Sequence, residues 1–324
     1  MKVGIIGAGN IARSLAYAIN GLGEGYEAYA VASRELTKAQ KFAQEHKVQK
    51  VYGSYEEMLQ DENVDLVYIA TPHSHHYEHM KLCLQYKKPV LCEKAFTANA
   101  TQAREILAEA KAQGVFVTEA IWTRYMPSRQ MINDIIQEGV IGTLQSLQGN
   151  LGYPMAHLER MHNLELAGGA LLDLAVYPLN FASMVLGDDI DRIEGVCQKL
   201  STGADCQDSI TLFYKDGKVA QLYATMMSAT NRLGVIYGDK GYIEVTNINN
   251  CEKIFVFDND HKCIREVDVP KQINGYEYEV IACKEALETG KLECPQMPHA
   301  ETIRMMEWMD ELRRQWGITF PTEG

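Results

Sequence analysis

Several features are absent from this sequence, and each absence excludes a class of protein. No stretch approaches the roughly 18 consecutive apolar residues of a membrane span, and there is neither an internal repeat nor a low-complexity segment. The eight cysteines lie far apart with no C-x-x-C pair, which disfavours a disulfide framework and a zinc knuckle and indicates reduced thiols. Because a glycine turn already begins at residue 7, no signal peptide fits ahead of it, and a cytoplasmic location is expected.

An excess of positive charge is also missing. The chain has 31 Lys and Arg residues against 43 Asp and Glu residues, and its formal net charge is -12. This balance argues against nucleic acid and against an anionic membrane surface as partners, although it is compatible with a local basic pocket for a phosphate. The length of 324 residues is sufficient for two domains with a large buried core.

The first dozen residues predict a dinucleotide-binding turn. A short apolar run leads directly into Gly7-x-Gly9-x-x-Ala12, as in a buried parallel strand followed by a glycine turn and a helix. Gly7 permits the tight turn, Gly9 lets a pyrophosphate approach the backbone, and Ala12 keeps the helix close to the strand. The free N–H groups at the helix start, including those of Asn10 and Ile11, would hold the phosphates. An ordinary strand-turn-helix is the alternative.

The end of the second predicted strand, residues 28–32, indicates which cofactor is preferred. Ser33 and Arg34 follow it and offer a hydroxyl and a guanidinium to the 2′-phosphate of NADP, with Lys38 as an extra cation. Glu27 has the spacing of the acid that binds the ribose of NAD, but it precedes the strand and would lie at the wrong end. NADP is therefore favoured and NAD remains open. The other interpretation is that Arg34 only solvates a helix start.

Histidines cluster after the third predicted strand. Thr71-Pro72 is followed by His73 and by histidines at positions 75, 76 and 79. Positions 75 and 79 would share a helix face, but no nearby cysteine or carboxylate completes a set of metal ligands, so no metal site is predicted. This loop lies at the carboxyl edge of the predicted sheet, where cofactors bind. We therefore expect Thr71, Pro72 and His76 to face the cofactor.

The fourth predicted strand ends on a charged pair, Glu93-Lys94. A lysine at the C-terminal edge of a buried strand is unusual for packing, but it lies where a nicotinamide ring should be and it can donate to a substrate oxygen. Trp122 and Arg124 follow the fifth strand at the same edge, and we expect them beside the nicotinamide and the substrate. Hinge packing with a salt bridge is the alternative for both.

The regular alternation of strand and helix ends near residue 121 and divides the chain into two predicted domains. Residues 1–121 are expected to form a Rossmann domain of the α/β class with a doubly wound parallel sheet. From residue 142 onward the segments alternate in polarity, so residues 122–324 are expected to form a substrate-binding α+β domain with an open, mainly antiparallel sheet. Ser54 and Thr101 are the expected N-caps of two helices in the first domain.

The second predicted domain contributes its own candidate residues. Asp173 and Tyr177 are four residues apart, which places them on one helical face about one turn from each other. The alternative is a carboxylate favoured by the helix dipole and a half-buried aromatic side chain. Tyr153, His157 and Arg160 lie shortly before this helix. We expect these three residues to reach the substrate pocket, where arginine and histidine suit polyhydroxylated or acidic substrates.

Together these motifs resemble the glucose-fructose oxidoreductase, inositol dehydrogenase and MocA family over essentially the whole chain. The residues that carry the resemblance are Gly7-x-Gly9-x-x-Ala12, Thr71-Pro72 with His76, Glu93-Lys94, and Gly168-Gly169 with Asp173 and Tyr177. Within the family the chain looks most like the branch of dimeric dihydrodiol dehydrogenase and NADP-dependent D-xylose dehydrogenase. This narrower resemblance is carried by residues 32–34, 119–124, 168–174 and 317–321.

The resemblance implies a fold, an assembly and two catalytic groups. It implies an N-terminal Rossmann domain and a C-terminal domain whose open sheet forms the interface of a homodimer. The family's catalytic lysine falls on Lys94, and the tyrosine that serves this branch as acid or base falls on Tyr177. Two positions depart from the family pattern: Ala95 replaces a proline, which would loosen the turn after the lysine, and His73 replaces an asparagine, which would alter contact with the ribose.

The protein is expected to be an NADP-dependent dehydrogenase that transfers a hydride between NADP and the secondary alcohol of a sugar or a vicinal diol. The hydride donor would be a CH–OH group or a CH–CH diol. The pKa of free tyrosine is about 10, so Lys94 across the pocket would be needed to stabilise the phenolate of Tyr177. Asp173 would orient the substrate or tune Lys94. Two alternatives stay open: a glycosidase that keeps its nicotinamide bound, and a nonenzymatic sensor of NADP(H).

Overall fold

The computed structural model describes residues 1–323, and the chain divides into two compact units. Unit 1 combines Met1–Tyr125 with Gln272–Met306, and unit 2 combines Met126–Lys271 with the C-terminal residues from Glu307. The sequence predicts a single division after residue 121. In the structure residues 272–306 return to unit 1, which the sequence did not predict.

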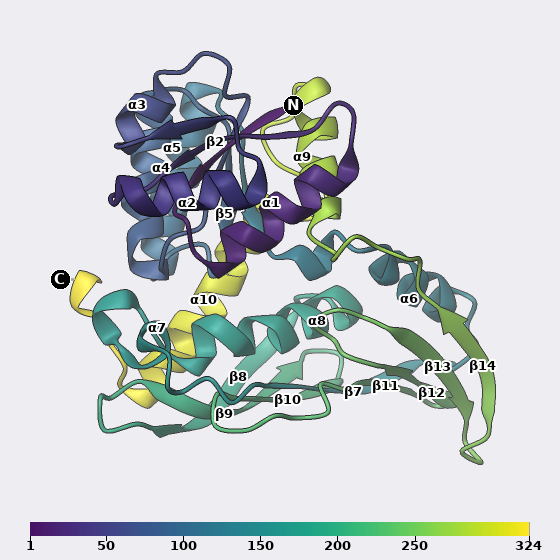
Figure 1. The fold of residues 1–324 in the computed structure, drawn as a ribbon. Helices are drawn as coiled ribbons and strands as arrows, with labels where there is room; N and C mark the ends of the chain where they lie inside the picture. Colours follow the sequence, from purple (N-terminus) through teal and green to yellow (C-terminus); the bar gives the residue numbers. More distant parts are fainter. Residues whose placement is uncertain (324) are drawn as a thin grey trace. The chain divides into compact units, whose positions relative to one another are not determined.

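Unit 1 contains a six-stranded parallel sheet in the order β3-β2-β1-β4-β5-β6 (Figure 1). The strands are β1 (Lys2–Ile6), β2 (Glu27–Ala32), β3 (Lys50–Tyr52), β4 (Leu66–Ile69), β5 (Val90–Glu93) and β6 (Val117–Ala120). The strand order reverses between β1 and β4, and the crevice at such a reversal is where doubly wound sheets bind ligands. The predicted doubly wound Rossmann sheet is confirmed.

Helices pack around the sheet of unit 1 (Figure 1). They are α1 (Asn10–Leu22), α2 (Leu36–His46), α3 (Tyr55–Leu59), α4 (His73–Gln85), α5 (Ala100–Gln113), the short η1 (Trp122–Arg124), α9 (Glu277–Glu288) and the first residues of α10 (His299–Trp316). Ser54 caps α3 as predicted, because its hydroxyl accepts the N–H of Glu57 at 3.2 Å. The predicted cap at Thr101 is wrong: α5 begins earlier, and the Asn99 side chain accepts the N–H of Gln102 at 2.9 Å.

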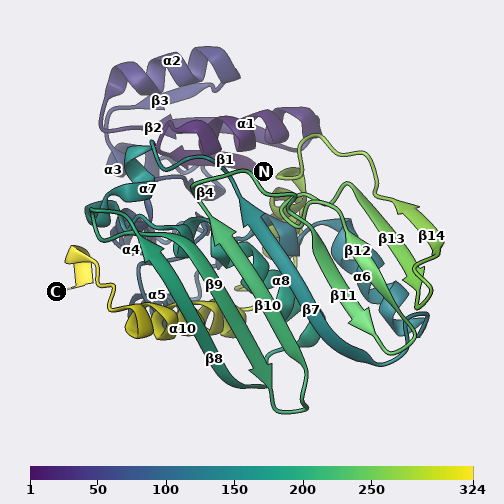
Figure 2. The same ribbon diagram turned by 90° about the horizontal axis from the view of Figure 1, so that it is seen from below.

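Unit 2 contains an eight-stranded sheet in the order β14-β13-β12-β11-β7-β10-β9-β8 (Figure 2). The strands are β7 (Leu144–Gly152), β8 (Ile190–Lys199), β9 (Asp205–Tyr214), β10 (Val219–Thr225), β11 (Gly234–Gly238), β12 (Gly241–Val245), β13 (Lys253–Asp258) and β14 (Cys263–Asp268). Neighbouring strands are antiparallel except for β7 and β10, which are parallel. The predicted mainly antiparallel sheet is confirmed.

The helices of unit 2 lie on one face of this sheet. They are α6 (Pro127–Gln137), α7 (Glu159–His162), η2 (Leu164–Leu166), a π-helical turn η3 (Leu171–Ala175), α8 (Val176–Leu186), the remainder of α10 and η4 (Pro321–Glu323). The segment Leu164–Leu186 is long and apolar enough to cross a membrane, but 89% of its apolar window is buried inside the protein, as is typical of a core helix. Among the described residues of unit 2, no helix covers the face of the sheet that is turned toward the viewer in Figure 2.

Aromatic side chains lie in a row across three strands of unit 2. The register pairs Tyr237 with Tyr242, and Tyr242 with Phe257. The rings of Tyr242 and Phe257 stack with their centroids 4.8 Å apart. Along their strands these partly exposed residues alternate with residues that are fully buried: Ile236, Ile243 and Val256. The row therefore points to the face of the sheet opposite the buried core.

Candidate functional site

The glycine turn after β1 has the geometry that a dinucleotide requires. Gly7 has a positive φ of 99°, which favours glycine, and its N–H donates to the Ala32 carbonyl at 3.0 Å. Helix α1 begins at Asn10 and no side chain caps it, so its first N–H groups remain available. A Cβ at Gly9 would meet no atom within 4 Å, and Ala12 is fully buried against the sheet. This open cradle at the helix start fits a pyrophosphate.

The end of β2 presents one guanidinium that forms no ion pair. Arg34 is exposed, and within residues 1–323 its side chain has neither a hydrogen bond nor an ion pair. Lys38, in contrast, is paired with Glu35 at 2.6 Å. Ser33 is 9% exposed and its hydroxyl accepts the N–H of Glu35 at 3.3 Å. Glu27 begins β2 and so lies at the opposite end of the strand, as predicted.

His76 links the loop after β4 to the loop after β5. The side chain is fully buried, and its two ring nitrogens lie 2.9 Å from the Ala95 carbonyl and 2.8 Å from the Thr71 carbonyl. Burial lowers the pKa of His76 to about 3, so the ring is neutral and donates to only one of these oxygens. The Thr71 hydroxyl forms a hydrogen bond with His79 at 2.9 Å. His76 is thus placed to hold both loops together. Pro72, which directly follows Thr71, is half-buried.

Lys94 follows directly after β5 and is half-buried. Its backbone N–H donates to the Glu93 carboxylate at 3.2 Å, and the Tyr68 hydroxyl donates to the other oxygen of that carboxylate. Glu93 is 6% exposed, so this carboxylate is satisfied inside the sheet. The peptide bond between Lys94 and Ala95 is cis. The backbone that carries the lysine is therefore fixed by a buried carboxylate on the same strand.

Trp122 and Arg124 are both buried in unit 1. The Trp122 ring stacks on Tyr276 with the centroids 4.2 Å apart and an interplanar angle of 6°. Arg124 forms an ion pair with Glu301 and is only 3% exposed. Packing and a salt bridge, the alternative interpretation of these two residues, are therefore present in the structure. Contact with the nicotinamide and the substrate stays a prediction.

In unit 2 the structure brings Asp173 and Arg160 together. Asp173 lies in η3 and accepts a hydrogen bond from the Arg160 guanidinium at 2.6 Å. Tyr177 follows in the first turn of α8, and both Asp173 and Tyr177 are nearly buried, with exposures of 6% and 8%. The Arg160 side chain is 45% exposed. The structure therefore joins Asp173 to a partly accessible guanidinium and places Tyr177 four residues further along the same helical segment.

The other predicted substrate residues of unit 2 have different surroundings. The Tyr153 hydroxyl lies 3.3 Å from the Arg232 guanidinium and 3.2 Å from the Asn249 amide. His157 is exposed in the segment between β7 and α7. Arg232 and Asn249 could not be predicted from the sequence, because each lies about 80 or more residues beyond Tyr153 and only the folded sheet brings them to it.

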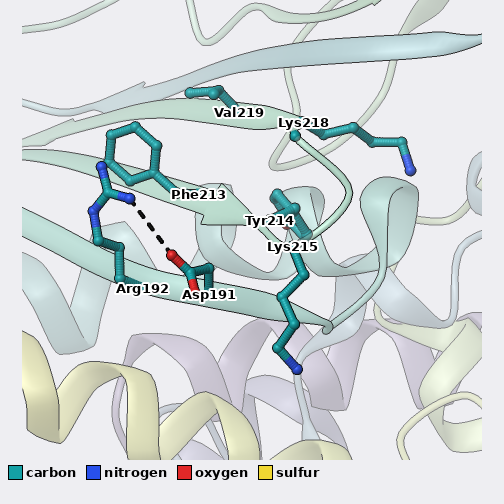
Figure 3. A pocket seen from close by; sticks show the side chains of 8 residues that line it. Asp191, Arg192, Phe213, Tyr214, Lys215, Lys218 and Val219 are labelled. Carbon is teal, nitrogen blue, oxygen red and sulfur yellow. Dashed lines mark ion pairs between the residues drawn. The ribbon is translucent and has the colours of Figure 1, made fainter.

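A shallow depression in unit 2 is lined by residues 191–192, 213–215 and 217–219 (Figure 3). Its cations are matched by acids: Arg192 lies 3.5 Å from Asp191, Lys215 pairs with Asp189 at 2.5 Å, and Lys218 pairs with a neighbouring aspartate. Within residues 1–323 no group of three His, Cys, Asp or Glu side chains is arranged to hold a metal ion.

Comparisons with known proteins agree over the whole chain. The family model described as "Oxidoreductase family, NAD-binding Rossmann fold" matches residues 1–121, and the model described as "GFO/IDH/MocA C-terminal domain" matches residues 130–244. A trans-1,2-dihydrobenzene-1,2-diol dehydrogenase of Macaca fuscata fuscata is 33% identical over 330 residues, which cover 100% of this chain and 99% of the relative.

Two solved structures share the fold. A 3-ketoreductase from Actinomadura kijaniata in complex with NADP has a TM-score of 0.83 and 25% identity, and the match covers 97% of each chain. An aldose-aldose oxidoreductase from Caulobacter crescentus complexed with glycerol has a TM-score of 0.87 and 17% identity, and the match covers 97% of this chain and 96% of the other.

Proposed function

Because this chain belongs to the GFO/IDH/MocA oxidoreductase family, we propose that it is an NADP-dependent dehydrogenase acting on the secondary alcohol of a sugar or a vicinal diol. The observation that carries this proposal is the full-length similarity to a diol dehydrogenase at 33% identity. The open cradle at Gly9 supports it, because it suits the dinucleotide that such a reaction requires. The reverse reaction, reduction of the corresponding carbonyl, uses the same groups.

The preference for NADP over NAD is supported by Arg34. Its guanidinium has no partner among the described residues and follows β2 at the edge where the adenosine ribose of a bound dinucleotide lies. A planar guanidinium matches the geometry of a phosphate and forms strong, charge-assisted hydrogen bonds with it. Glu27, which has the spacing of the acid that binds the ribose of NAD, begins β2 and lies at the other end of the strand. The acid that does follow β2, Glu35, is paired with Lys38 at 2.6 Å.

The proposed chemistry assigns one role to each group. Bound at the Gly7-x-Gly9 turn and Arg34, NADP would supply the hydride acceptor for oxidation or the hydride donor for reduction. The Tyr177 phenolate takes the proton from the substrate hydroxyl, and the resulting phenol returns it in the reverse direction. The Lys94 ammonium stabilises both the phenolate and the alkoxide that develops during hydride transfer. Asp173, held by Arg160 at 2.6 Å, orients the substrate hydroxyls.

A spectrophotometric screen tests this function. Aldoses, inositols and vicinal diols are offered with NADP⁺ and with NAD⁺, and reduced nicotinamide is followed at 340 nm. We expect steady accumulation of NADPH with at least one polyol and slower accumulation of NADH. Release of free sugar from a glycoside without net reduction would favour the bound-nicotinamide glycosidase. Tight NADPH binding with no turnover on the whole panel would favour a sensor.

We also propose that the chain forms a homodimer through the uncovered face of the sheet in unit 2. The row of Tyr237, Tyr242 and Phe257 on this face supports the proposal, since aromatic rows on an open sheet are typical of interfaces. Sedimentation velocity should give a dimer, and Tyr242→Glu should shift it to a monomer. Tyr17→Glu is the control, because Tyr17 is 61% exposed on α1 of unit 1. A monomeric parent protein would contradict the proposal.

We propose a cytoplasmic location without membrane attachment. The cysteines support it, because all eight are free thiols in the structure, as is usual in a reducing compartment. Fractionation of cells that express the protein tests the location, and recovery in the membrane or secreted fraction would contradict it.

A further inference from the structure

Two aspartates on β9 point into the core of unit 2. Asp205 and Asp208 are 1% and 0% exposed, and they lie in a strand whose other inward residues are mostly apolar. Buried carboxyl groups are costly unless they are paired or hydrogen-bonded, so their retention in the core calls for a physical explanation. Neither residue belongs to the catalytic groups proposed above.

Asp205 bonds to the start of the helical segment that carries the proposed catalytic groups. Its carboxylate accepts the N–H of Leu171, the first residue of η3, at 2.5 Å. A carboxylate at this position satisfies a free helical N–H and interacts favourably with the helix dipole. Asp173 and Tyr177 follow in the same continuous helical segment. Strand β9 therefore caps this segment from a distance of 34 residues along the chain.

Of the two glycines before the segment, Gly169 makes room for this contact and Gly168 makes room for the backbone near Arg160. Gly169 has a φ of 149°, and a Cβ there would lie 2.2 Å from a carboxylate oxygen of Asp205. A Cβ at Gly168 would lie 2.6 Å from the backbone oxygen of Arg160, whose side chain binds Asp173. The close approach of Asp205 thus explains why glycine is needed directly ahead of the helical segment.

Asp208 can give Asp205 one more hydrogen bond, in addition to those that Asp205 accepts from the backbone of Ala170 and Leu171. Within residues 1–323 neither oxygen of Asp208 meets an N–H or O–H group, so a hydrogen bond between the two carboxyls requires a proton on one of them. Burial and the adjacent charge of Asp205 raise the pKa of Asp208 well above its usual range, which places the proton on Asp208. The pair then carries one negative charge, directed at the helix start.

Few other titratable groups face this pair. Cys206 lies on the same strand and Cys197 lies opposite on β8, and burial raises the pKa of both thiols, so both are neutral near pH 7. Lys199 of β8 pairs with Asp205 in register, but its ammonium donates to the Trp316 carbonyl at 2.5 Å. From β10, the residue opposite Asp208 is an alanine.

We propose that Asp205 and Asp208 act as a pair of positioning residues for Asp173 and Tyr177, and that a proton shared between the two carboxyls keeps Asp205 bonded to the first turn of the helical segment. This inference rests on the proposed function, because it assigns the effect of the pair to the acid–base group of that reaction. Loss of the shared proton frees Asp205 to rotate, and the helix start shifts with it. A shift of about 1 Å in a catalytic group can lower turnover on the order of 100-fold.

The test compares two substitutions at one position. Asp208→Asn keeps an N–H donor for Asp205, whereas Asp208→Leu has a similar size and no donor. We expect Asp208→Leu to lower kcat at least about tenfold while NADPH binding stays unchanged, and Asp208→Asn to retain kcat within about twofold. Asp260→Asn, an exposed aspartate between β13 and β14, is the matched control and should change nothing. Full kcat in folded Asp208→Leu would overturn the proposal.

A stability measurement keeps the proposal testable even if Asp208→Leu fails to fold. Asp208 ionises freely in the unfolded chain but holds its proton in the folded one, so the native protein should lose stability as the pH rises above about 4. Asp208→Asn lacks this loss, and its melting temperature should rise relative to the parent between pH 5 and pH 8. If the melting temperatures of the parent and of Asp208→Asn change with pH in the same way, the proposal of a shared proton is overturned.

Failure of this inference can be distinguished from failure of the proposed function. If Tyr177→Phe keeps full activity, the proposed acid–base group is wrong, whatever Asp208→Leu does. If Tyr177→Phe is inactive and folded Asp208→Leu is fully active, the proposed function stands and the positioning pair is overturned.

Discussion

In unit 1 Lys94 directly follows a buried parallel strand, whereas in unit 2 Tyr177 lies on a helical segment whose first N–H is bonded to a carboxyl from strand β9. The lysine depends on neighbours in its own strand and the adjacent one, since Glu93 binds its backbone and Tyr68 binds Glu93. The tyrosine depends on Asp205, which lies 28 residues further along the chain. Lys94 is therefore positioned by local contacts, whereas Tyr177 is positioned by a contact between segments that are distant in the sequence.

The largest expected effect would show whether both regions contribute to one reaction. Lys94→Ala and Tyr177→Phe should each lower kcat about 1,000-fold, because each removes a group that stabilises charge or moves a proton in the transition state. The dissociation constant for NADPH, measured by fluorescence titration, should change little in both variants. Full activity of either variant would show that the residue substituted in it has no catalytic role.

A buried acid of unit 1 offers the next largest effect. Burial raises the pKa of Glu119 to about 7, well above its value in an unfolded chain. Glu119 is thus protonated when folded at pH 5, and the protein should lose up to about 3 kcal/mol of stability between pH 4.5 and pH 7 through this group. Glu119→Gln should remove that loss.

Urea unfolding at pH 5 and pH 8 measures the effect. The stability of Glu119→Gln relative to the parent should increase with pH. The same difference at both pH values would contradict the assignment. Turnover should distinguish the two buried acids, because Glu119→Gln is expected to change stability alone, whereas Asp208→Leu is expected to lower kcat as well.

Cofactor selection tests a second locally placed group of unit 1. Arg34→Ala should weaken NADPH binding on the order of 20-fold, since it removes a charge-assisted contact with the 2′-phosphate, and should leave NADH binding nearly unchanged. Lys38→Ala is the control and should have a smaller effect, because Lys38 is paired with Glu35. Calorimetry measures both dissociation constants. A larger loss of NADPH affinity in Lys38→Ala than in Arg34→Ala would show that Lys38, and not Arg34, selects the cofactor.

The smallest expected effect concerns helix caps within unit 1. Asn99→Ala should lower the free energy of unfolding by about 1 kcal/mol, because the N–H of Gln102 loses its acceptor. Thr101→Ala, two residues later, should be close to neutral. Chemical denaturation of both variants measures the difference. An equal loss at Thr101 would mean that α5 begins later than the structure shows.

The sequence predicted those parts of the site that depend on local pattern. An apolar run followed by Gly7-x-Gly9 predicts the strand, turn and open helix start, because glycine spacing and burial are local requirements. The same holds for Lys94, since a charge after a buried strand must lie at the edge of the sheet. Ser54 was recognisable as a cap, but Asn99 and Thr101 are both polar and only the backbone geometry selects between them.

Contacts between distant segments could not be predicted. Asp205 reads as an acid in a strand, and no periodicity indicates that it bonds to Leu171. Arg124 could have met any acid of the chain, and its partner Glu301 lies 177 residues away. The return of residues 272–306 to unit 1 likewise leaves no local signal, because an amphipathic helix does not specify which surface it covers.

That return has a practical consequence for anyone preparing a fragment. Strand β6 is the last strand of its sheet, and the returning segment occupies its outer edge: the Val117 N–H donates to the Leu292 carbonyl at 3.1 Å, and His299 binds the Val117 carbonyl at 2.8 Å. A recombinant fragment that ends at residue 121 would expose this edge to other chains and is expected to aggregate. Its soluble expression would require residues 272–306 to be joined back to it.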